Sequence, residues 1–169
     1  MADKKEFKND FSWSFSRHNT FNTCKRKYYY SYYGSWGGWN KDAEELSQKL
    51  YMLNKMTSLP MLAGSIVHDE VERTLKTLRY GRNADQNKSR DNVIKNFKQS
   101  WNQSKNKEWK DSPKWKTNLF EHYYDQKPSD ENLLDLRDLM LDSIDGFFAS
   151  DSYRFIRTMS DSQWLAIED

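Results

Sequence analysis

The sequence has little cysteine and no long hydrophobic run. Cys24 is the single cysteine of the 169 residues, which excludes an internal disulfide framework and is compatible with a reducing compartment. No apolar stretch approaches the length of a membrane span, and the opening MADKKEFKND lacks the apolar core of a signal peptide. The sequence therefore predicts a soluble, cytoplasmic protein that does not use a membrane as a partner.

The sequence also lacks a large excess of positive or of negative charge. The chain has 27 Lys and Arg against 25 Asp and Glu, so a nucleic-acid partner has to be argued from local clusters rather than from net charge. Aliphatic residues are few, but the 15% of aromatic residues can supply buried area, and the net charge of +2 causes little self-repulsion. We expect residues 1–169 to form a single domain, with residues 1–10 flexible.

The strongest helical pattern covers residues 59–80. Ser58 and Pro60 suit the start of a helix, and Gly81 suits a left-handed end. The apolar residues recur at spacings of three and four and form one stripe, which consists of Leu59, Leu62, Ala63, Ile66, Val67, Val71, Leu75 and Leu78. A helix with such a stripe is expected to pack against the rest of the domain.

Three residues lie in line on one flank of this helix. Gly64, His68 and Glu72 are one turn apart, and we expect their flank to be half buried. A glycine inside a helix costs about 1 kcal/mol relative to alanine, which suggests that something approaches the backbone at Gly64. Taken alone, His68 fits a structural residue held by an internal hydrogen bond better than it fits a ligand.

The only dense basic cluster belongs to an N-terminal helix. Ser14 or Ser16 is expected to cap this helix, which would run to about Tyr33. Its CKRKYYYSYY segment mixes cations with flat rings, a combination that neutralises phosphates and stacks on bases. The predicted nucleic-acid contacts are Arg17, Lys25, Arg26, Lys27 and Tyr28. The alternative is a tyrosine-rich core face with a solvated basic side.

The remaining chain is predicted to be almost entirely helical. The expected helices run from a capping box at Asp42 and Glu45 to Met56, from Ser89 to Lys107, onward from Ser112 and Pro113, from Ser129 to a loosened end at Gly146, and from Tyr153 to Met159. The segment NQSKNKEWKD is expected to be mostly exposed, and QWLAIED is expected to begin a strand. The predicted fold class is therefore mainly α.

Several short motifs occur in an order that a known family shares. The matching residues are Ser14 and Ser16 of an S-x-S segment, Cys24 and Tyr28 of C-x-x-x-Y, Gly64 and His68 of G-x-x-x-H, and Trp164 and Glu168 of W-x-x-x-E. From about Phe11 to Asp169 the chain resembles the PD-(D/E)XK nuclease superfamily. It is similar to the RecB-like branch, which includes CRISPR-associated RecB-like exonucleases and the nuclease domains of bacterial recombination helicases.

The resemblance implies the helical N-terminal part of an α/β restriction-endonuclease-like fold, ending at the first core strand. It also implies a DNA nuclease that depends on Mg²⁺ or Mn²⁺ and acts on single strands or ends. In such families the histidine matched by His68 contributes to the metal centre, together with an Asp and a Glu-x-Lys on adjacent strands. Gly64 and Glu72 would then be supporting residues beside His68.

The sequence also departs from the family pattern. The Asp and Glu-x-Lys should follow the strand that begins at Trp164, but the sequence ends at Asp169. We interpret Glu108 and Lys110, which form a Glu-x-Lys in a polar segment, as a coincidence. We therefore expect a shortened chain, or one without its strand core, that is inactive until a further domain or chain completes the sheet.

Cys24 is interpreted as a small buried residue of the first helix. In some relatives the matching cysteine binds an iron–sulfur cluster together with three more cysteines, and those three are missing here, so no such cluster is expected. Two other classes of function remain open. The chain fits a non-catalytic nucleic-acid-binding module, and it fits a helical protein-interaction domain.

Overall fold

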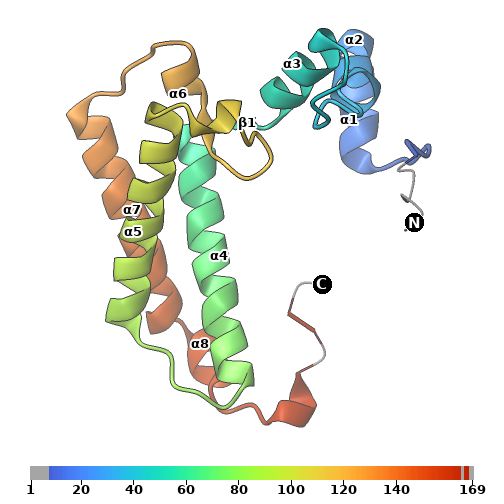
Figure 1. The fold of residues 1–169 in the computed structure, drawn as a ribbon. Coiled ribbons are helices and arrows are strands. Elements are labelled where there is room, and N and C mark those ends of the chain that lie inside the picture. Colours follow the sequence, from blue (N-terminus) through green and yellow to red (C-terminus); the bar gives the residue numbers. More distant parts are fainter. Residues whose placement is uncertain (1–7, 165, 168–169) are drawn as a thin grey trace, which may run out of the picture. The chain divides into compact units, whose positions relative to one another are not determined.

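A computed structural model describes residues 8–164 and 166–167 of the chain, which are mostly helical (Figure 1). In chain order the elements are α1 (Phe15–Thr23), α2 (Lys25–Tyr29), the π-helical turn η1 (Tyr30–Gly34), α3 (Glu45–Asn54), β1 (Met56–Thr57), α4 (Leu59–Arg79), α5 (Gln86–Lys105), the 3-10 turn η2 (Glu108–Lys110), β2 (Asn118–Leu119), α6 (Phe120–Tyr123), α7 (Asp130–Ala149), α8 (Asp151–Ile156) and the 3-10 turn η3 (Asp161–Gln163). β1 and β2 form a two-stranded parallel sheet. The predicted mainly α class is confirmed.

The chain divides into two compact units. The first unit consists of residues 1–56 and 108–116, and the second consists of residues 57–107 and 117–169. That residues 1–169 fold as a single domain stays a prediction. Most of the N-terminal segment that was expected to be flexible, residues 1–7, lies outside the described residues.

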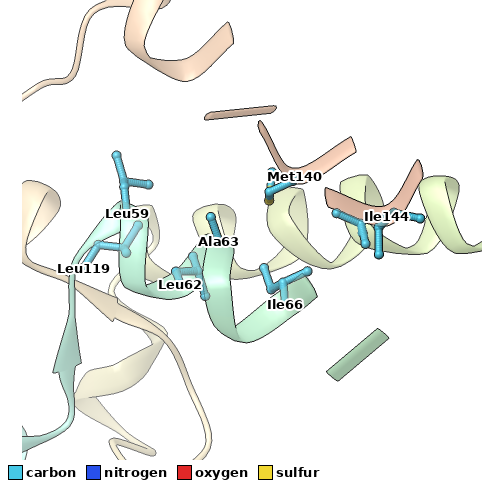
Figure 2. Packing of buried hydrophobic residues seen from close by; sticks show 8 residues of the cluster. Leu59, Leu62, Ala63, Ile66, Leu119, Met140 and Ile144 are labelled. Carbon is cyan, nitrogen blue, oxygen red and sulfur yellow. The ribbon is translucent and has the colours of Figure 1, made fainter. Parts of the chain in front are cut away.

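The second unit is built on α4, α5 and α7, which lie side by side (Figure 1). Each of the three helices contributes to one aliphatic cluster, and Leu119 joins it from β2. The buried members are Leu59, Leu62, Ala63, Ile66, Val93, Leu119, Met140 and Ile144, most of which are labelled in Figure 2. None of the helices in the described part of the chain is long and apolar enough to cross a membrane.

Side-chain caps fix the starts of α4 and α7 as predicted, whereas α5 begins at Gln86 after a cap at Asp85 rather than at Ser89. The Ser58 Oγ accepts a hydrogen bond from the Met61 N–H (3.4 Å), and the Ser129 Oγ accepts one from the Asn132 N–H (3.1 Å). Gly81 has a φ of +66°, the left-handed conformation expected after α4. The helix starts at Ser58 and Ser129 are therefore confirmed, although α7 continues past Gly146 to Ala149.

The first unit differs from its prediction at Cys24. Ser14 caps α1 by accepting from the Arg17 N–H (3.2 Å), but Cys24 adopts an extended conformation (φ −161°, ψ 106°) that ends α1 and starts α2. Its Sγ accepts a hydrogen bond from the Lys27 N–H (3.4 Å), and the residue is exposed. The predictions of one continuous helix to Tyr33 and of a buried Cys24 are therefore wrong.

Two further segments have different boundaries or burial from those expected. α3 begins at Glu45 and ends at Asn54, before Met56, and no side-chain hydrogen bond caps its start. The segment expected to be mostly exposed at the end of α5 is so, but it also contains two buried residues, Ser104 and Trp109. Residues that are close in space but not in sequence bury these two side chains, and the polarity of the surrounding sequence does not reveal such contacts.

The segment that begins at Ser112 was expected to form a helix and does not. Residues 113–115 form a turn, followed by β2 and the single helical turn α6. A serine before a proline suits a turn as well as a helix start, so the local pattern was ambiguous. For the predicted final strand, Trp164 and residues 166–167 lie outside helix and strand, and residues 165, 168 and 169 are not among those described.

Candidate functional site

The proposed metal-site residue lies on the outer side of α4. His68 is exposed, and a Cβ placed on Gly64 would meet no atom within 4 Å. The expectation of a half-buried flank is therefore wrong at His68 and at Gly64, where no neighbour lies close, and holds only at Glu72. α4 buries Ile66 and Glu70. His68 is two residues from each, which is roughly 200° around the helix at ~100° per residue, so its side chain faces away from the buried side.

Glu72 lies one turn beyond His68 and pairs with Lys76. The hydrogen-bonded Lys76 ammonium lowers the pKa of the Glu72 carboxyl below its ordinary value, and the charge of a protonated His68 acts in the same direction. The Glu72 side chain is 25% exposed. His68 and Glu72 therefore share one accessible face and interact electrostatically.

A buried carboxylate on the opposite face was missed by sequence reasoning. Glu70 is 3% exposed and accepts a hydrogen bond from the Arg73 Nε (2.8 Å) as well as weaker ones from the Asn92 amide (3.4 and 3.5 Å). The bond to Glu70 raises the pKa of the Arg73 guanidinium. This arrangement ties α4 to α5, which gives Glu70 a structural role. The Glu70–Arg73 spacing, i to i+3, is the sequence signal that could have indicated the pair.

A Ser–His pair was missed as well. The Ser104 Oγ lies 2.9 Å from the His122 Nδ1 and accepts a hydrogen bond from the Leu119 N–H (2.9 Å). Burial lowers the pKa of the His122 imidazole, with Glu121 opposing and Lys105 assisting. Because Ser104 is fully buried, no substrate reaches its hydroxyl. The pair joins α5 to β2 and α6 and is structural.

The described residues do not by themselves fit a divalent metal. Among residues 8–164 and 166–167, no three His, Cys, Asp or Glu side chains are grouped so that they could hold an ion. Mg²⁺ and Mn²⁺ prefer several oxygen ligands, so an exposed His68 alone is an incomplete site. No catalytic step through a metal follows from this part of the chain.

The predicted DNA-contacting cations are accessible. Lys25, Arg26 and Lys27 are all exposed, and the Lys25 Nζ lies 5.5 Å from the ring centroid of Phe21. Arg17 is half buried, with its Cζ 4.4 Å from the ring centroid of Tyr32. Within the described residues, none of these four forms a salt bridge, so their charges face solvent or rings rather than carboxylates.

Tyr28 does not present its ring for stacking. It is 8% exposed, and its ring contacts those of Phe21 (5.3 Å between centroids) and Tyr32 (5.2 Å). A hydrogen bond with Tyr33, together with burial, raises the pKa of Tyr28. That Tyr28 contacts nucleic acid stays a prediction, and the burial of its ring fits the tyrosine-rich core alternative.

Comparison with known families identifies the class of protein. A family model described as the PD-(D/E)XK nuclease superfamily matches residues 12–143, well over half of the chain. The chain belongs to this superfamily. The matched region includes the Ser14–Tyr28 segment and the α4 residues Gly64 and His68, and it ends before Trp164. No match is found among curated proteins or among solved structures.

Proposed function

We propose that this chain is the DNA-binding helical part of a RecB-like, Mg²⁺- or Mn²⁺-dependent DNA nuclease related to the CRISPR-associated and recombination-helicase exonucleases. The observation that carries the proposal is the superfamily match over residues 12–143, which contains both the basic N-terminal helices and α4. The substrate is DNA, as single strands or ends.

His68 is the proposed metal-site residue of this chain. Its exposure on α4 and the open space at Gly64 support the proposal, because incoming carboxylates could approach this face. Glu72 supports His68 electrostatically from one turn away. The remaining ligands would come from a further domain or chain that completes the sheet, so the chain alone is inactive.

A nuclease assay of the 169-residue chain with Mg²⁺ or Mn²⁺ tests this arrangement. We expect no cleavage of single- or double-stranded DNA above the background of a heat-denatured sample. Metal-dependent cleavage that disappears in His68→Ala would overturn the proposal that outside ligands are needed.

DNA binding itself depends on the exposed cations of α2. Replacing Arg26 and Lys27 by Ala should weaken DNA binding and reduce its salt dependence, because each phosphate contact releases counterions. The matched control is the exposed pair Lys95 and Lys98 on α5. If no DNA binding is measurable at low salt, the proposed function is wrong.

A non-catalytic nucleic-acid-binding module is the second candidate. It is supported by the accessible cations on α2 and by the lack of a metal-ligand group in the described part of the chain. The two candidates separate when the chain is combined with the sheet-completing part. Cleavage restored by that combination favours the nuclease, and binding without cleavage favours the module.

A further inference from the structure

A groove in the first unit has aromatic walls. Two pockets of about 620 and 450 Å³ share the lining residues Trp39, Tyr51 and Lys55. They therefore adjoin along these side chains, and we call them together the Trp39 groove and each of them one of its arms. Both volumes lie in the range of roughly 300–1,000 Å³ that is usual for ligand sites. All of the lining residues belong to the first unit.

Three tryptophan rings of the Trp39 groove are exposed. Trp115 in the first arm is 76% exposed, and Trp39 and Trp36 are 41% and 38% exposed. Leaving apolar rings in water is unfavourable by roughly 25 cal/mol per Å². Exposed rings gathered along one groove therefore indicate a binding surface rather than an incomplete core.

Cations lie beside these rings. The Lys114 Nζ is 4.6 Å from the ring centroid of Trp115, and the Lys55 Nζ is 5.5 Å from that of Tyr51. Arg17, which lines the second arm, is placed over Tyr32 of the same arm. Against these three cations the described walls present one carboxylate, that of Asp111, so the groove favours an anionic occupant.

Close packing fixes the central wall. A Cβ on Gly38 would lie 2.2 Å from the Ser47 backbone oxygen, so the loop before Trp39 is pressed against α3. The Trp39 ring then meets Trp36 and Tyr51 edge-on, with centroids 4.9 and 5.7 Å apart. The central ring is held in place before any ligand arrives, which lowers the entropic cost of binding.

We propose that the Trp39 groove binds single-stranded DNA, with unpaired bases stacking on Trp115 and Trp39 and phosphates lying against Lys55, Lys114 and Arg17. Rings combined with cations along a groove are the features that hold single strands without sequence preference. A duplex keeps its bases stacked on one another and offers no free base faces to these rings. The inference rests on the proposed DNA-binding function and adds the location of the contact and the residues that make it.

Fluorescence anisotropy at low salt tests the proposal on the complete 169-residue chain. Three labelled probes of equal length are compared: an oligothymidine, a fully abasic strand and a duplex. We expect the oligothymidine to bind about tenfold or more tighter than the abasic strand, because stacking on aromatic rings is the main difference between them. The duplex should also bind more weakly than the oligothymidine.

Trp115→Ala is the main variant. It should weaken oligothymidine binding about tenfold and change abasic binding less than about twofold, and Trp115→Phe should restore most of the loss. Because Trp115 is so exposed, its removal is not expected to unfold the first unit, and circular dichroism checks this. Tyr80→Ala, a 74% exposed ring in the second unit, is the matched control and should change nothing.

The outcomes separate this inference from the proposed function. Equal affinity for oligothymidine and abasic strands, or unchanged binding by Trp115→Ala while Arg26→Ala/Lys27→Ala weakens it, overturns the groove and leaves the DNA-binding function standing. No binding of any probe overturns both. Quenching of tryptophan fluorescence by oligothymidine, lost in Trp115→Ala, would support the stacking directly.

Discussion

The two units of the chain bury different kinds of side chain. In the second unit, Val93 and Leu119 are completely buried and Ile144 is 1% exposed, so aliphatic side chains form a sealed core between helices. In the first unit the buried hydrophobic residues are mostly rings, such as Tyr51 at 9% and Trp109 at 5% exposure. The core of the second unit is therefore mainly aliphatic, whereas that of the first is mainly aromatic.

This difference separates the tasks of the two units. In the first unit, Tyr51 belongs to the core and also lines the Trp39 groove, so stability and the proposed DNA binding share a residue. In the second unit, His68 lies on the face of α4 opposite the core, so a change at His68 should leave packing intact. In the first unit, a measured loss of binding therefore has to be separated from a loss of stability, whereas at His68 it does not.

The largest expected effect contrasts two tryptophans of the first unit. Trp109→Ala should lower the free energy of unfolding by about 3–5 kcal/mol, because it empties a buried site. Trp115→Ala should change it by less than about 0.5 kcal/mol, because its ring is mostly in solvent. Urea unfolding measures both. Equal losses would mean that the first unit does not distinguish core rings from groove rings.

In the second unit, Ile144→Ala should cost about 2–5 kcal/mol by leaving a cavity in the aliphatic cluster. Leu139→Ala on the same helix is the control and should cost far less, since Leu139 is 62% exposed.

Calorimetry adds a test of the single-domain prediction. If residues 1–169 unfold as one domain, Trp109→Ala and Ile144→Ala lower one shared transition, and two independent transitions would contradict it.

A smaller effect should separate two ion pairs of α4. Arg73→Met leaves the buried Glu70 carboxylate without its main partner and should cost about 1–3 kcal/mol, a value reduced because the Arg73 side chain is 46% exposed. Lys76→Met breaks the outer pair with Glu72 and should cost less than about 0.5 kcal/mol. Urea midpoints measure both changes, and equal costs would show that the burial of Glu70 carries no penalty.

The smallest effect is a pH dependence from His122. Burial lowers the pKa of His122 in the folded chain. At a pH below the ordinary pKa of histidine, the unfolded chain therefore binds more protons than the folded chain. Stability is therefore full above about pH 6.5 and declines as the pH falls through that value and below it. Urea midpoints at pH 7.5 and 5.5 should differ less in His122→Gln than in the unchanged chain. The same difference in both would contradict the assignment.

Strong apolar periodicity with clear caps predicted the long helices of the second unit. The pattern that starts after Ser58 and the one after Ser129 correspond to α4 and α7. In the first unit the aromatic residues did not define one helix, because Cys24 adopts an extended conformation and η1 has π-helical hydrogen bonds. Rings tolerate several packing geometries, so their spacing constrains the backbone less than an aliphatic stripe does.

Only part of the candidate site could be predicted, because the local pattern defines a helix but not which of its sides packs inward. The sequence placed Gly64, His68 and Glu72 in line on one helix, which the structure has, but the side of the helix that packs inward depends on α5 and α7. Asn92 on α5 helps to bury Glu70, a contact that no local pattern contains. The Trp39 groove combines segments that lie about 70 residues apart in the sequence, since Trp115 lines the same pocket as Trp39 and Tyr51. Sequence spacing does not reveal such a contact.

The break between α1 and α2 makes the chain well suited to site-specific labelling. Cys24 is the sole thiol of the sequence and stands exposed directly before Lys25, Arg26 and Lys27. A maleimide dye would attach at one position only, without any cysteine having to be removed first. Its emission would report on a DNA strand that reaches those cations, and energy transfer to a dye on the strand's end would give the direction in which the strand runs.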